Sequence, residues 1–129
     1  MAPGNVACIF GAPGAGKSLI GPHIAYQVAL GEPVFGMRTR QGSAFYIAAE
    51  DPHGMQGRIA ALVIRQGHAP RFQLVVELSD LFDDKSSDLD GLAEAVEQER
   101  PSIIIIAALI TSCNAQAPTS CPKTASSIL

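Results

Sequence analysis

Several features that would restrict the function of this chain are scarce or missing. The 129 residues contain no tryptophan, two tyrosines, and three cysteines without a Cys-x-x-Cys pair. Without such a pair, neither a disulfide framework nor a zinc knuckle is indicated. The apolar runs are too short to span a bilayer, and no basic stretch followed by an apolar segment opens the chain. We therefore expect a protein of the reducing cytoplasm that does not bind membranes.

The chain also lacks an excess of positive charge. Its formal net charge is −3, and 47% of its residues are hydrophobic. This balance is ordinary for a soluble globular protein, and the length allows one domain. Arginines do gather locally, at Arg58, Arg65 and Arg71. We interpret them as part of a solvated face, because a nucleic-acid groove needs a denser basic patch.

The most informative motif that is present follows the apolar residues 6–10, which we expect to form a buried strand. It matches the pattern G-x-x-x-x-G-K-[ST] and consists of Gly11-Ala12-Pro13-Gly14-Ala15-Gly16-Lys17-Ser18. Glycines let such a loop turn tightly, so that its backbone N–H groups cradle phosphate oxygens. Lys17 would reach the β- and γ-phosphates, and the Ser18 hydroxyl would ligate Mg²⁺. A glycine-rich turn without a ligand is the alternative, but a strand before it and a helix after it favour a phosphate-binding loop.

The helix that begins at Lys17 and Ser18 points the positive end of its dipole at the same anion. The motif and the residue after it are therefore our candidates for contacting a nucleoside triphosphate. These candidates are Gly11, Ala12, Pro13, Gly14, Ala15, Gly16, Lys17, Ser18 and Leu19.

Apolar periodicity and turn residues predict an alternation of strands and helices. Expected strands are residues 6–10, 43–48, 72–76 and 103–106, and expected helices are residues 18–30, 55–66 and 88–97. Cys8, inside the first of these strands, should be a small core residue. The alternation predicts an α/β fold, a three-layer sandwich around a mostly parallel sheet.

The motif, together with residues 45–52 and 100–106, resembles RecA-like P-loop ATPases related to RepA-type plasmid replicative helicases. The resemblance covers residues 5–106. It implies binding of ATP and Mg²⁺, ATP hydrolysis, assembly into a ring of identical subunits, and action on single-stranded DNA. It also makes Glu50, at the end of the second expected strand, the match to the carboxylate that polarises the attacking water. The alternative is that Glu50 is only a solvated strand end.

The chain departs from this family directly after its run of isoleucines. An aspartate that holds Mg²⁺ through water is expected there, but Ala107 and Ala108 occupy the positions. We expect hydrolysis to fall by on the order of 10²-fold, the usual effect of losing one preorganised electrostatic group. Binding should survive.

Residues 107–129 contain no acidic residue and no sustained periodicity, so we expect an irregular tail. Residues 1–106 would then form a partial RecA-like domain whose C-terminal strands are missing. A shift of reading frame after Ile106 is one explanation for this tail, and a naturally shortened variant is the other.

Two other functions are compatible with the loop. A small-molecule or nucleotide kinase would use the same motif, but it would also need an acceptor site and a mobile lid bearing arginines. A nucleotide-binding remnant without turnover is the non-enzymatic alternative, and Ala107 favours it.

Overall fold

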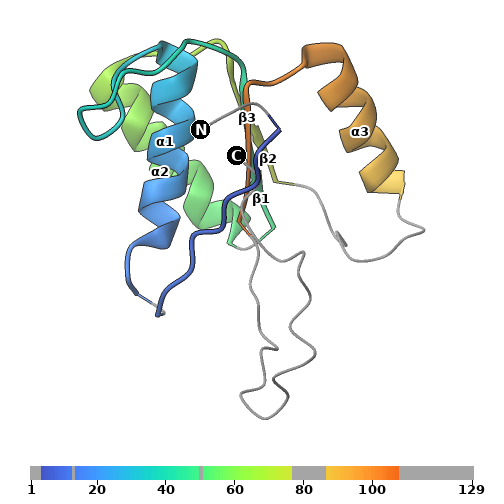
Figure 1. Cartoon of the computed structure of the whole chain (residues 1–129). Coiled ribbons are helices and arrows are strands. Elements are labelled where there is room, and N and C mark those ends of the chain that lie inside the picture. The colour runs from blue at the N-terminus through green and yellow to red at the C-terminus, as the bar shows by residue number, and fades with distance from the viewer. Residues whose placement is uncertain (1–3, 13, 50, 77–86, 108–129) are drawn as a thin grey trace.

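The computed structural model describes residues 4–12, 14–49, 51–76 and 87–107. These residues form three helices and three strands that alternate along the chain (Figure 1). In chain order, the elements are α1 (Lys17–Leu30), β1 (Ala44–Ala48), α2 (Pro52–Gln66), β2 (Phe72–Val75), α3 (Ser87–Glu99) and β3 (Ile103–Ala107).

The three strands form a parallel sheet in the order β2-β1-β3. In the register of this sheet, Ala44 of β1 lies between Phe72 of β2 and Ile103 of β3. Every residue of β1 is buried, as expected for the middle strand of a parallel sheet covered on both faces. The expected mostly parallel α/β sheet is therefore confirmed.

The strand order determines where the helices lie. The connection through α2 leads from β1 to one neighbour, and the connection through α3 leads across β1 to the other. Because such crossovers are right-handed, the two helices must lie on opposite faces of the sheet. Figure 1 shows α1 and α2 together on one face and α3 on the other. The chain thus has the three layers that the sequence predicts.

The main core lies between α1 and the sheet. Small residues, Ala25 and Ala29 of α1 and Ala44 and Ala48 of β1, bring the two backbones close together. Tyr26 fills the space that remains and is 1% exposed. Its hydroxyl donates a hydrogen bond to the carbonyl of Gly67, beyond the end of α2. This packing fixes the direction of α1 relative to the carboxyl ends of the strands.

Glycine ends α1 as the sequence predicts. Gly31 has a φ of 78°, in the left-handed region that L-residues with side chains rarely adopt. Its N–H donates to the carbonyls of Gln27 and Val28, which also accept from the N–H groups of Glu32 and Gly42, so these carbonyls at the helix end are satisfied.

The prediction of a strand at residues 6–10 is wrong. The structure places these residues outside the sheet, and Val6 and Phe10 are 68% and 85% exposed. Cys8 is also exposed, so the prediction that it is a core residue is wrong too. An apolar run shows that a segment can be buried, but a strand needs a neighbour that pairs with its N–H and carbonyl groups. In this structure residues 6–10 pair with neither β2 nor β3, the two edge strands of the described sheet.

Candidate functional site: a glycine loop and the groove beside it

Two glycines of the loop have backbone conformations that residues with a side chain rarely adopt. Gly14 and Gly16 have φ values of 81° and 86°, where a residue with a Cβ atom would be strained. Gly16 is also the N-cap of α1, and its carbonyl accepts hydrogen bonds from the N–H groups of Leu19 and Ile20. The loop therefore leads directly into the first turn of α1. Pro13 lies outside the described residues.

Lys17 folds back onto the loop. Its ammonium Nζ donates to the carbonyl oxygens of Gly11 at 2.7 Å and Ala12 at 2.9 Å. A positive charge is thereby held against the loop at the N-terminal end of a 14-residue helix. The N–H groups of Lys17 and Ser18 have no partner inside this helix, because they precede its first hydrogen-bonded turn. The ammonium and the helix end together make this loop suitable for an anion.

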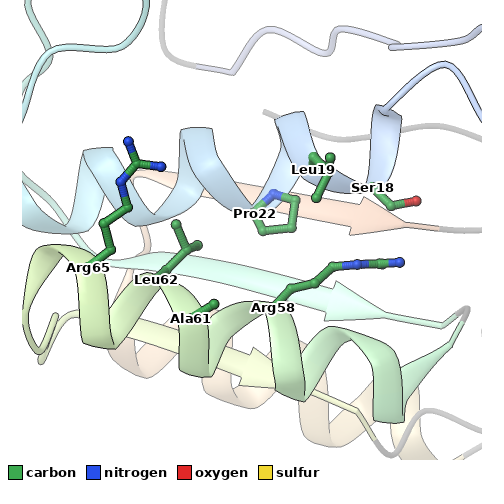
Figure 2. A pocket seen from close by; sticks show the side chains of 7 residues that line it. All are labelled: Ser18, Leu19, Pro22, Arg58, Ala61, Leu62 and Arg65. Carbon is green, nitrogen blue, oxygen red and sulfur yellow. The ribbon is translucent and has the colours of Figure 1, made fainter.

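A groove of about 210 Å³ lies beside the loop, between α1 and α2 (Figure 2). It is lined by Ser18, Leu19, Pro22, Arg58, Ala61, Leu62 and Arg65. In Figure 2 the Ser18 hydroxyl and the Arg58 guanidinium lie toward the same end of the groove, near the carboxyl ends of the strands. The Arg65 guanidinium lies toward the other end.

The interpretation of Arg58 and Arg65 as a plain solvated face missed this groove. Their spacing of seven residues places both on one face of a helix, and this signal was available in the sequence. What the sequence did not reveal is that the face lies against the start of α1.

Pro22 contributes to the groove in a second way. It is buried in α1 and has no N–H, so the carbonyl of Ser18, four residues earlier, receives no helical hydrogen bond from it. The first turns of α1, which lie beside the site, therefore have one backbone hydrogen bond fewer than a helix without proline.

Asp51 is the N-cap of α2 and lies near Arg58, which lines the groove. Its Oδ1 accepts a hydrogen bond of 3.0 Å from the N–H of Gly54, so the side chain caps the helix. Its Oδ2 lies 3.8 Å from Nη2 of Arg58. Glu50, the residue before Asp51, lies outside the described residues. Its neighbour Ala49 donates an N–H to the carbonyl of Ala107 at 3.1 Å, beyond the last residue of β1.

Comparison with known proteins agrees with this arrangement. A protein-family model described as an AAA domain matches residues 1–125. The chain belongs to the AAA domain family. Membership makes it a nucleotide-binding domain of the ATPase type, as the loop and α1 indicate. No curated protein and no solved structure matches this AAA domain.

In the part of the chain that the structure describes, this AAA domain offers few side chains that could bind a metal ion. No group of three or more His, Cys, Asp or Glu side chains there is placed to hold a metal ion. The Ser18 hydroxyl is exposed, and a hydroxyl oxygen suits a hard cation such as Mg²⁺. Ala107, where the resemblance to RecA-like ATPases leads us to expect a carboxylate, lies beside Ala48 in the sheet and offers only a methyl group.

None of the helices within the described ranges of this AAA domain is long and apolar enough to cross a membrane. The match to the family model also extends beyond residue 106, to residue 125. Residues 108–129, which we expect to be irregular, lie outside the described residues.

Proposed function

We propose that this AAA domain binds Mg-ATP through residues 11–18 and hydrolyses it slowly. The observation that supports the proposal most strongly is the position of the Lys17 ammonium, held against the loop where α1 begins. A compact cation and a helix N-terminus in one place attract the β- and γ-phosphates together. The glycine conformations at Gly14 and Gly16 supply the turn that such a cradle needs.

Ser18 is the residue of this chain that would hold the metal ion. Its hydroxyl would contribute one oxygen, and phosphate oxygens and water would complete the ligand set. When bound, Mg²⁺ would neutralise charge between the β- and γ-phosphates. The loop residues would hold the triphosphate in place, and Lys17 would balance the charge that develops as the terminal bond breaks.

For hydrolysis we assign Glu50 as the residue that orients the attacking water. This assignment rests on the resemblance to RecA-like ATPases and on the chain position of Glu50 after β1. Ligands of open parallel sheets bind at the carboxyl ends of the strands, where Glu50 follows Ala49. Since Ala107 has no carboxylate, we propose that turnover is reduced by on the order of 10²-fold.

Coupling to single-stranded DNA, assembly into a ring and residence in the cytoplasm belong to the proposal. They rest on the resemblance to RepA-type helicases and on the ordinary composition of the chain. A kinase is disfavoured because the chain contains no arginine-rich insertion that could form a lid.

The test is a titration of the full chain with ATP and Mg²⁺, compared with the Lys17→Ala variant. We expect Lys17→Ala to abolish measurable binding, because the motif brings no second side-chain cation to the phosphates. Arg71→Ala is the matched control, since it removes an exposed cation at the start of β2, away from the loop. Unchanged ATP affinity in Lys17→Ala would contradict the proposed function.

A further inference from the structure

Arg58 lines the same groove as Ser18, although the two residues come from different helices. We propose that Arg58 binds the terminal phosphate of the nucleotide and thereby lets the site distinguish a triphosphate from a diphosphate. This inference rests on the proposed function, because it assumes that residues 11–18 bind the nucleotide. It adds a specificity residue from α2, outside the glycine loop and its helix.

Among the residues that the structure describes, the guanidinium of Arg58 has a single, weak ion-pair partner. Its Nη2 lies 3.8 Å from Oδ2 of Asp51, near the outer limit for an ion pair. Both side chains are well exposed, at 39% and 54%, so water screens their attraction. Such a pair contributes little to stability, and a phosphate group that carries more charge would displace the carboxylate readily.

Asp51 keeps its structural role when Arg58 leaves it. Its other oxygen, Oδ1, still accepts the hydrogen bond from the N–H of Gly54 and caps α2. The exchange therefore needs only a movement of the Arg58 side chain. No helix has to unwind for it.

The position of Ser18 identifies the phosphate concerned. In the loop motif the Ser18 hydroxyl would hold the Mg²⁺ that accompanies the terminal phosphates of the nucleotide. The groove runs from Ser18 toward α2, and Figure 2 shows the Arg58 guanidinium extending to the same end. A planar guanidinium offers paired N–H donors that match two oxygens of one phosphate. A diphosphate ends before this point and would leave Arg58 with Asp51.

Arg65 provides an internal comparison. It has the same side chain, belongs to the same helix and lines the same groove, but it lies toward the end away from Ser18. A general effect of positive charge on anion binding would involve both arginines. A direct contact with the terminal phosphate would involve Arg58 alone.

The experiment measures the affinity of the full chain for ADP and for a non-hydrolysable ATP analogue, each with Mg²⁺. We expect Arg58→Ala to weaken triphosphate binding by about tenfold or more, the scale of a hydrogen bond to a charged group, and to leave ADP affinity unchanged. Arg65→Ala should leave both affinities unchanged. Arg58→Gln, which keeps most of the side-chain stem, should behave like Arg58→Ala and is the substitute if the alanine variant does not fold.

A variant of Asp51 tests whether the carboxylate competes with the terminal phosphate for Arg58. Asp51→Asn removes the competing charge but keeps an oxygen that can accept from Gly54, so triphosphate affinity should rise by a few-fold while ADP affinity stays the same. The inference is overturned if Arg58→Ala leaves the ratio of the two affinities unchanged, or if Arg65→Ala changes it as much. Failure of the proposed function looks different, because the unmodified chain would then bind neither nucleotide.

Discussion

Gly21 of α1 lies against the ring of Tyr46 of β1, so closely that a methyl group on Gly21 would stand 3.1 Å from ring atom Cε2. Tyr46 is 1% exposed, so its ring has no free space into which it could move. The contact occurs one turn after Ser18. It therefore holds the first part of α1, and with it the glycine loop, against the middle of the sheet.

This contact predicts opposite effects for the same substitution at two helical glycines. Gly57→Ala in α2 should stabilise the fold by about 0.5–1 kcal/mol, because alanine is the better helix former and nothing lies within 4 Å of the new methyl group. Gly21→Ala should give no such gain, and Gly21→Val should cost about 1–3 kcal/mol through overpacking. Urea unfolding of the three variants measures this. Equal stabilisation by both alanines would show that α1 can move away from Tyr46.

A second prediction concerns the hydrogen bond that joins α1 to the end of α2. Tyr26→Phe removes the hydroxyl that donates to the Gly67 carbonyl but keeps the ring contact with Phe72, whose centroid is 5.3 Å away. We expect a loss of about 0.5–1.5 kcal/mol in the free energy of unfolding. Tyr26→Leu, which removes the ring as well, should cost clearly more. If the phenylalanine variant is as stable as the original chain, the hydroxyl contributes nothing to holding the two helices.

A carboxylate introduced at position 107 should improve metal binding without giving full ATP hydrolysis. Ala107 is the last residue of β3, and its carbonyl accepts from the N–H of Ala49. We expect Ala107→Asp to make nucleotide binding more dependent on Mg²⁺ but not to restore full turnover, because RecA-like rings take a further cation from a neighbouring subunit. Ala107→Asn, which has the same shape without the charge, is the control. Rapid hydrolysis by Ala107→Asp as a monomer would contradict this expectation.

The proposal about residues 107–129 predicts a cleavage site. The structure places Ala107 in β3, so the prediction concerns the residues after it. If residues 108–129 do not contribute to the sheet, a protease should remove them shortly after β3, and Mg-ATP should protect the glycine loop by mass action. Limited proteolysis of the full chain, followed by mass spectrometry with and without Mg-ATP, gives the answer. A tail that resists cleavage and exchanges its amide hydrogens slowly would show that it is a packed part of the domain.

The elements that sequence predicts well are those whose signals are local. The helix expected at residues 18–30 is observed as Lys17–Leu30, because Gly16 and Gly31 are its N-cap and C-cap. The four isoleucines form most of β3, although only Ile105 of them is fully buried, because β3 is an edge strand of the described sheet. The failure at residues 6–10 concerns a property that is not local, since strand formation depends on which neighbour is available.

The same difference between local and non-local signals applies to the site. The candidate phosphate loop could be proposed from the sequence because its motif lies within eight consecutive residues. The groove could not be predicted, because Ser18 and Arg58 are distant in sequence and line one groove only when α2 lies beside α1. A spacing pattern within α2 shows which residues share a face, but not which element that face meets.

The two hydrogen bonds of Lys17 have a consequence for how tightly any phosphate can bind. The Gly11 and Ala12 carbonyls act as internal competitors for the ammonium, so the measured affinity is the difference between the new contact and the old ones. Removing the side chain would also expose two carbonyl oxygens to an incoming anion, which they repel. The loss in Lys17→Ala should then exceed that of one attractive contact, and part of it should appear as a slower association rate.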